Sequence, residues 1–140
     1  MEMTLAILKP DTVAAGNSGK VLAHLEEKRF KIRGLKVMHL TRAQAEAFYA
    51  VHRERPFFAS LVAFMTEGPV VPVALERDNA VVELREVMGA TDVAKAAAGT
   101  IRKLYGSSIE RNAIHGSDSP ENARIELAFF FAASELIAAR

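Results

Sequence analysis

The sequence contains no cysteine. That absence excludes disulfide scaffolds, thiol catalysis and thiolate metal sites. An excess of either charge is also missing, because 18 basic and 17 acidic residues leave a formal net charge of +1. A dedicated binder of nucleic acid or of a membrane surface usually carries a lopsided basic charge, so neither kind of partner is indicated.

Membrane and targeting signals are absent as well. No apolar run in the sequence is long enough to span a bilayer. The first residues, Met1 to Thr4, carry no basic segment of the kind that begins a secretory signal. These features predict a cytoplasmic protein without a membrane partner.

The composition is that of a folded enzyme or binding module. The chain has 140 residues, of which 50% are hydrophobic and 25% charged. That length is normal for one domain, and the apolar content is sufficient for a packed core. Because there is no repeat, low-complexity tract or linker, we expect a single domain over residues 1–140.

The order of predicted elements indicates the fold class. Apolar runs predict four strands, at residues 4–8, 31–40, 69–75 and 127–131. Helices are expected from the turn at 15–19 to about 29, over 41–53, 57–65 and 78–88, at 94–98, and from the Ser119 cap onward, with a last helical turn at 133–138. Residues 106–116 are expected to form a loop. This order predicts an α+β ferredoxin-like sandwich, a four-stranded antiparallel sheet with helices packed on one face.

One segment comes close to a phosphate-binding loop. Residues 14–21 lie between a strand and a helix and contain Gly19-Lys20. A phosphate-binding loop needs Gly at the first position and Ser or Thr after the Lys, because that hydroxyl holds magnesium. Here those positions are Ala14 and Val21, so the segment is interpreted as an ordinary turn that begins a helix.

Four histidines are the first candidates for chemistry. His24 and His39 follow helix and strand patterns, which favours surface or packing roles. His52 lies late in a helix, where either a solvated helix end or a phosphate contact fits. His115 lies in a polar, Gly-containing loop that leads into a capped helix, a place where functional groups are often carried. Taken alone, a loop histidine is still more often structural than catalytic.

Basic residues at the ends of predicted elements are a second group: Lys9, Arg85, Arg102 and Arg111. Each one alone is best interpreted as a solubilising surface charge. No metal-ligand spacing such as His-Glu-x-x-His occurs, so the sequence predicts no metal held by protein side chains alone.

The motifs together resemble those of a known family. Asn112-x-x-His115-Gly116-Ser117-Asp118-Ser119 closely resembles the active-site signature of nucleoside diphosphate kinases. Further blocks match in order over most of the chain, from about residue 4 to residue 131: 7–11, 48–52, 55–58, 68–71, 88–91 and 98–102. The fold of that family is ferredoxin-like, in agreement with the element order.

The resemblance implies a role for each matching residue. His115 would be the nucleophile that accepts the γ-phosphoryl group, Glu126 would hold its other ring nitrogen, and Ser117 would support Glu126. Lys9 and Asn112 would contact the ribose hydroxyls, with Lys9 also near the transferred phosphate. Tyr49 would orient Lys9, and the base would stack on Phe57. The remaining matches would form the phosphate clamp: Arg85, Thr91 and Arg102.

The resemblance also implies the reaction and its partners. A nucleoside triphosphate, typically ATP, would phosphorylate His115, and a nucleoside diphosphate would then remove the group from the same pocket by ping-pong kinetics. Mg²⁺ would be held chiefly by the phosphates of the nucleotide. The protein would be a homo-oligomer, with tetramer and hexamer both open.

The sequence departs from the family pattern at two places. Asp92-Val93 stands where Asn-Pro is usual, and Lys103-Leu104-Tyr105 replaces a small residue, Asp and an aromatic. Both departures bear on stability and assembly rather than on catalysis. Two other hypotheses compete with the kinase: a non-catalytic ferredoxin-like module, and a secondary nucleic-acid role that the charge balance does not support.

Overall fold

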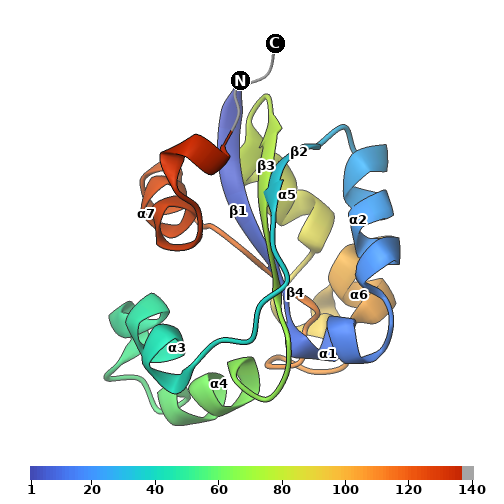
Figure 1. The fold of residues 1–140 in the computed structure, drawn as a ribbon. Coiled ribbons are helices and arrows are strands. Elements are labelled where there is room, and N and C mark those ends of the chain that lie inside the picture. Colours follow the sequence, from blue (N-terminus) through green and yellow to red (C-terminus); the bar gives the residue numbers. More distant parts are fainter. Residues whose placement is uncertain (137–140) are drawn as a thin grey trace.

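The computed structural model describes residues 1–136, in which one four-stranded sheet is flanked by helices (Figure 1). The strands are β1 (Glu2–Leu8), β2 (Lys31–Leu35), β3 (Val71–Arg77) and β4 (Ile114–Gly116). The α-helices are α1 (Pro10–Ala14), α2 (Ser18–Glu27), α3 (Arg42–Phe48), α4 (Phe58–Met65), α5 (Ala80–Met88), α6 (Ile101–Tyr105) and α7 (Pro120–Phe130). The 3₁₀ helices are η1 (Ala50–His52), η2 (Val93–Lys95) and η3 (Ala133–Glu135).

The sheet confirms the predicted ferredoxin-like fold class. Its strand order is β2-β3-β1-β4, and every neighbouring pair is antiparallel. At the centre, Leu5 of β1 pairs with Ala74 of β3, and Ile7 pairs with His115 of β4. The short strand β4 is therefore an edge strand, and it lies far along the chain from its partner β1.

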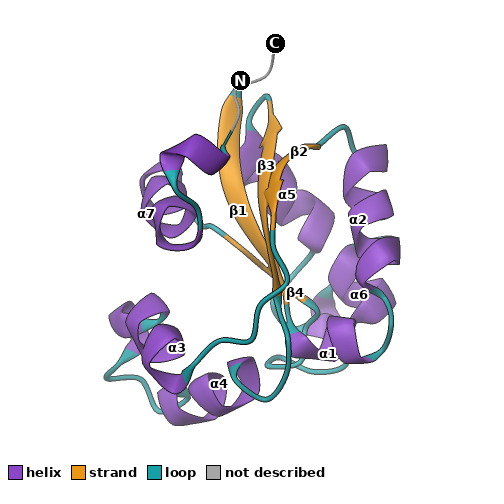
Figure 2. Cartoon of the chain, in the orientation of Figure 1, coloured by secondary structure: helices purple, strands orange, loops and turns teal. Residues whose placement is uncertain are grey.

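Helices cover both faces of the sheet, which corrects the prediction of one covered face (Figure 2). Alternate residues of β1 point to opposite faces, as in any strand. Leu8 packs in a core with residues of α2, α5 and α6. Leu5 and Ile7 pack in a second core with residues of α3, α4 and α7.

The fourth strand was predicted in the wrong place. Residues 127–131 do not form a strand: α7 continues through Phe130, and the strand is formed instead by Ile114–Gly116, in the predicted loop. The apolar run of residues 127–131 hid a helical spacing, because the buried residues of α7 are Ala123, Leu127 and Phe130. Positions three and four apart lie on one face of a helix.

Two predicted helix starts are confirmed by their capping contacts. Thr41 accepts a hydrogen bond from the Gln44 backbone N–H at 3.1 Å, and the Gln44 side chain accepts one from the Thr41 N–H at 2.8 Å. Ser119 accepts a hydrogen bond from the Asn122 N–H at 3.0 Å, with Pro120 in the first helical turn. Both caps place a helix that contributes to the pocket described below.

Several boundaries differ from the prediction. The sequence analysis missed α1 and α6, and the helix expected at 94–98 is only the 3₁₀ turn η2. Strand β2 contains a bulge between Ile32 and Gly34 and ends at Leu35 rather than at residue 40, since beyond Leu35 only Met38 forms a further bridge, to Val70. The start of α5 follows Asn79, which has a left-handed backbone (φ 52°).

Other elements shift by a few residues. Strand β3 runs over Val71–Arg77 rather than 69–75, and the long helix expected at 41–53 divides into α3 and η1. The last helical turn is η3, and residues 137–138 of its predicted span lie outside the described residues.

Candidate active site

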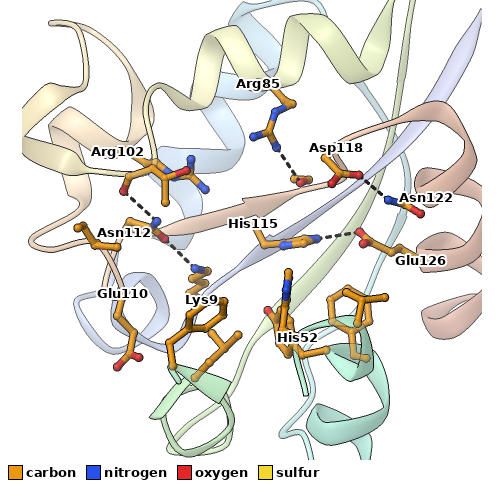
Figure 3. A pocket seen from close by; sticks show the side chains of 18 of the residues that line it. Lys9, His52, Arg85, Arg102, Glu110, Asn112, His115, Asp118, Asn122 and Glu126 are labelled. Carbon is orange, nitrogen blue, oxygen red and sulfur yellow. Dashed lines mark hydrogen bonds and ion pairs between the residues drawn. The ribbon is translucent and has the colours of Figure 1, made fainter. Parts of the chain in front are cut away.

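A cavity of about 570 Å³ lies between the α3–α4 segment, β4 and the exposed face of α7 (Figure 3). It is lined by every residue that the resemblance proposed for the site except Ser117, which is buried behind the wall. The lining residues from that set are Lys9, Tyr49, Phe57, Arg85, Thr91, Arg102, Asn112, His115 and Glu126. The fold thus brings together residues that are spread over most of the chain.

His115, Glu126 and Ser117 form one hydrogen-bonded group. His115 projects from β4, and its Nε2 lies 2.8 Å from Oε1 of Glu126 on α7. Ser117 Oγ donates to the same carboxylate oxygen at 2.8 Å. The side chains of His115 and Glu126 are only 19% and 20% exposed. A carboxylate acceptor at Nε2 favours the tautomer with the proton there, which leaves a lone pair on Nδ1.

The backbone before His115 has an unusual shape. Ala113 has φ 75°, in the left-handed region that non-glycine residues rarely adopt. The Ile114 N–H donates to the Asn112 carbonyl at 2.9 Å, which closes a tight turn around Ala113. Asn112 precedes this turn and His115 follows it, and both side chains line the cavity.

The start of α1 holds this turn in place. The Asp11 carboxylate accepts a hydrogen bond from the Ala113 N–H at 3.1 Å, and the Thr12 hydroxyl donates to the Ala113 carbonyl at 2.9 Å. The Lys9 N–H donates to the same carbonyl at 2.9 Å. These contacts join two segments about a hundred residues apart, and the sequence analysis gave neither Asp11 nor Thr12 a role in the site.

Lys9, Asn112 and Thr91 form a second polar group. Lys9 Nζ donates to Asn112 Oδ1 at 2.7 Å, and Asn112 Nδ2 donates to the Thr91 carbonyl at 3.2 Å. Burial lowers the pKa of Lys9 to about 8, with the positive charge of Arg102 acting in the same direction and the Asp11 and Glu110 carboxylates opposing. Lys9 is thus a cation that is held in the pocket without an ion-pair partner within hydrogen-bond distance among residues 1–136.

The two arginines lie along the free edge of β4. Arg102 Nη2 donates to the Ile114 carbonyl at 2.9 Å, and Arg85 Nη1 donates to the Gly116 carbonyl at 3.3 Å. An edge strand leaves such carbonyls unpaired by the sheet, so the arginines satisfy them while their charge lines the pocket. Burial, and then the neighbouring charge of Arg85, lowers the pKa of Arg102 to about 10.

Gly116 is required by packing. A Cβ at this position would lie 2.5 Å from Met88 Sδ and 3.0 Å from Leu84 Cδ2. Gly116 therefore lets β4 lie close against α5, the helix that carries Arg85.

Phe57 and Ile109 present exposed apolar surface to the pocket. Their exposed fractions are 45% and 61%, high for residues of this size. The His52 ring lies 5.4 Å from the Phe57 ring and also lines the cavity. The sequence analysis left His52 open between two roles and did not single out Ile109.

Tyr49 does not make the contact expected of it. Its hydroxyl has no hydrogen-bond partner among residues 1–136, and Lys9 donates to Asn112 instead. Burial, with the negative charge of Glu126, raises the pKa of Tyr49. Its ring lies edge-on to His115, with the centroids 6.2 Å apart.

Phe48 is a pocket residue that sequence reasoning missed. Its ring meets the His115 ring edge-to-face at 5.4 Å between centroids, and it also contacts Tyr49, Phe129 and Phe130. Such aromatic contacts fix the orientation of the imidazole. Phe48 lies in the matched block 48–52, but the match gave it no role.

Acidic groups in the pocket are few and separate. Within residues 1–136, no group of three or more His, Cys, Asp or Glu side chains could hold a metal ion. Asp118 lies near Arg85 in the view of Figure 3, with its carboxylate accepting from Asn122 at 2.6 Å.

In the part of the chain that the structure describes, no helix is long and apolar enough to cross a membrane.

Comparison with known proteins identifies the family of this chain. The family model described as nucleoside diphosphate kinase matches residues 2–136. The nucleoside diphosphate kinase of Geotalea daltonii is 56% identical over 137 residues, which cover 98% of this chain and 100% of that protein. The Chlamydia felis nucleoside diphosphate kinase is 53% identical over 98% of this chain and 97% of its own.

The solved structures that resemble this chain include members of the same family. The Aquifex aeolicus nucleoside diphosphate kinase superposes with a TM-score of 0.95 at 45% identity, covering 97% of this chain and 99% of that chain. The Halobacterium salinarum nucleoside diphosphate kinase, solved in complex with CDP, superposes with a TM-score of 0.94 at 40% identity, covering 99% of this chain and 93% of that chain.

Fold, sequence and relatives define a phosphotransferase that acts on nucleotides. The chain belongs to the nucleoside diphosphate kinase family.

Proposed function

We propose that this protein transfers the γ-phosphoryl group of a nucleoside triphosphate to a nucleoside diphosphate by a ping-pong reaction through phosphohistidine at His115. The observation that carries the proposal is the held imidazole: Nε2 is engaged by Glu126 at 2.8 Å, and Nδ1 has no hydrogen-bond partner among residues 1–136. A nucleophile activated by an oriented acceptor is the usual arrangement for covalent catalysis.

In the first half-reaction, the Nδ1 lone pair of His115 attacks the γ-phosphorus and the bond to the β–γ bridging oxygen breaks. The diphosphate leaves with the bonding electrons, and the phosphorylated imidazole becomes cationic. The Glu126 carboxylate, held by Ser117 at 2.8 Å, stabilises this cation through the Nε2–H. In the second half-reaction, a terminal oxygen of another nucleoside diphosphate takes the phosphoryl group from Nδ1.

The cationic side chains would bind the phosphates. Arg85 and Arg102 are held along β4 by backbone carbonyls, so their positions are set before a ligand arrives. Positioned cations are what phosphoryl transfer asks of a protein, because charge spreads over the transferred group. Thr91, whose carbonyl is tied to Asn112, would add a hydroxyl to this clamp.

The nucleoside would occupy the other end of the cavity. Lys9 and Asn112, which are hydrogen-bonded to each other, would offer an ammonium and an amide to the ribose hydroxyls. The exposed Phe57 ring offers a stacking surface, and stacking tolerates every base because each has a π-face. We retain Tyr49 in the proposed set as a wall residue beside His115, not as a hydrogen-bond partner of Lys9.

Mg²⁺ fits this pocket as a companion of the nucleotide. The ion prefers one or two carboxylates together with substrate phosphates and water, and Asp118 is a carboxylate that lines the same cavity as Arg85. When bound, Mg²⁺ neutralises phosphate charge. The protein side chains alone form no acidic cluster within the described residues.

We also propose that the protein assembles as a homo-oligomer, tetramer or hexamer. Strand β2 is an edge of the sheet, and its last residue Leu35 and the following Val37 are 44% and 68% exposed. A native mass measurement would identify the assembly, and a monomer would contradict it. A cytoplasmic location stays a prediction.

The central experiment is labelling with ATP that carries a radioactive γ-phosphate. We expect an acid-labile, base-stable phosphoprotein that disappears in His115→Ala and persists in the matched control His52→Ala, whose imidazole lines the same cavity. Circular dichroism should show both variants folded. Label that survives in His115→Ala would remove the assignment of the nucleophile. Absence of any label in the wild-type protein would favour a non-catalytic module.

A further inference from the structure

Glu110 is an acidic residue that lines the cavity and has no role in the proposed function. It lines the same cavity as Lys9, Arg85 and Arg102. The other two carboxylates there bind residues that line the same cavity, because Glu126 binds His115 and Asp118 accepts from Asn122. Because a negative side chain repels polyphosphate, Glu110 is expected to act on the nucleoside part of the ligand rather than on its phosphates.

Glu110 lies at the end of the cavity that the proposed function assigns to the nucleobase. Figure 3 shows Glu110 on the opposite side of the pocket from Arg85. Its chain neighbour is the exposed Ile109, and the exposed ring of Phe57 lines the same cavity. Asn112, the proposed ribose contact, follows two residues later. A base stacked on Phe57 would therefore have its edge beside the Glu110 carboxylate.

Ser60 holds the carboxylate in place. The Ser60 hydroxyl lies 3.1 Å from Oε1 and 2.8 Å from Oε2 of Glu110. Ser60 and Phe57 are three residues apart at the start of α4, so they lie on the same side of the helix. A carboxylate has about four acceptor positions, and one hydroxyl hydrogen leaves most of them available. The group is thus an anchored acceptor next to the proposed base platform.

We infer that Glu110 is a specificity-determining residue that accepts a hydrogen bond from an exocyclic amino group of the nucleobase stacked on Phe57. The inference rests on the proposed function. Guanine is the best match, because its N1–H and 2-amino group are adjacent donors that suit the two oxygens of a carboxylate. The pocket then accepts every base by stacking and favours guanine by this contact.

The test compares two donors that differ only in that amino group. Inosine triphosphate is guanosine triphosphate without the 2-amino group. The rate of His115 phosphorylation is measured at limiting concentrations of each donor, for the wild-type protein, Glu110→Ala and Glu110→Gln. A single hydrogen bond to a charged group in a part-exposed site corresponds to about a three- to tenfold preference. We expect that preference for GTP in the wild type, a ratio near one in Glu110→Ala, and an intermediate ratio in Glu110→Gln, which keeps a neutral acceptor.

Glu67→Ala is the matched control. It also removes one negative charge next to this segment, but Glu67 binds Arg111 at 2.6 Å and does not line the cavity. The GTP-to-ITP ratio should be unchanged in this variant. A Glu110→Ala variant that slows both donors by the same factor would overturn the inference, since that result indicates a ribose contact or a general charge effect. A wild type with no preference would overturn it as well.

Failure of the proposed function would look different. Phosphohistidine at His115 forms with either donor if the proposed function holds, whatever the ratio between them. No labelling with any triphosphate would contradict the kinase reaction itself, whereas equal labelling by GTP and ITP would contradict only the role of Glu110.

Discussion

Glu126→Gln tests the central contact of the site. The substitution preserves the length of the side chain and removes its charge, so the contacts to His115 and Ser117, both 2.8 Å long, lose their ionic partner. A hydrogen bond to a charged group contributes roughly 1.5–3 kcal/mol, and a neutral one about 0.5–1.5 kcal/mol. The difference of about 1–1.5 kcal/mol applies most strongly after phosphorylation, when the imidazole is cationic. Both side chains are mostly buried, so solvent screening is weak.

A loss of that size predicts a slower first half-reaction. Each 1.36 kcal/mol corresponds to a factor of ten, so phosphorylation of His115 should slow by roughly five- to fifteenfold. The assay is a single-turnover quench-flow measurement with labelled ATP, in which the rate constant at saturating ATP is compared between variants. A urea titration should show that Glu126→Gln remains folded under assay conditions.

Glu121→Gln is the control for charge loss on the same helix. Glu121 lies in the first turn of α7 and does not line the cavity. Its replacement should leave the phosphorylation rate within twofold of the wild type. If Glu126→Gln also stays within twofold, the carboxylate does not stabilise the phosphorylated imidazole, and the reasoning from the hydrogen bond is refuted.

Three further predictions concern charge, stacking and packing. Because the pKa of Lys9 is about 8 in the free protein, kcat/KM should fall as the pH rises through 8, and this fall should vanish in Lys9→Arg, whose charge persists; a wild-type profile that stays flat to pH 9.5 would contradict it. Phe57→Ala should raise KM by roughly tenfold with little change in kcat, since base stacking contributes about 1–3 kcal/mol; steady-state kinetics with several bases check this, and an unchanged KM would exclude the stacking surface. Gly116→Ala should lower the free energy of unfolding by about 1–3 kcal/mol, because a Cβ meets Met88 Sδ at 2.5 Å, whereas Gly19→Ala, where a Cβ meets nothing within 4 Å, should not; equal urea midpoints for the two would contradict the packing argument.

Local signals were predictable from the sequence, and long-range ones were not. The Thr41 and Ser119 caps depend on residues three apart, so the sequence shows them directly. The strand at residues 114–116 is three residues long and has too little pattern to be recognised. It exists because β1 pairs with it, and no local property of those three residues predicts that pairing.

The candidate site shows the same division. The resemblance placed His115 and Glu126 in one group, and the structure brings them to 2.8 Å. Residue patterns alone left His115 as a loop histidine, because its partner lies eleven residues later on a helix whose start only the Ser119 cap revealed. Asp11 and Phe48 fall in matched blocks of the sequence but received no role, since their contacts with Ala113 and His115 depend on the folded chain.

The backbone at Ala113 explains why the histidine faces the pocket at all. Side chains of β4 alternate between faces, and Ile114 packs with the α2–α5 core while Gly116 meets Met88 of α5. His115 must therefore point to the other face, where Phe48 lies. A register shift of one residue would reverse the two faces and bury the imidazole of His115 against α5. The turn at Ala113, tied to Asp11, fixes where β4 begins and so fixes that register. In this fold the orientation of the proposed nucleophile is thus decided by a backbone turn two residues before it, and the hydrogen bond to Glu126 acts on a ring that is already on the correct side of the sheet.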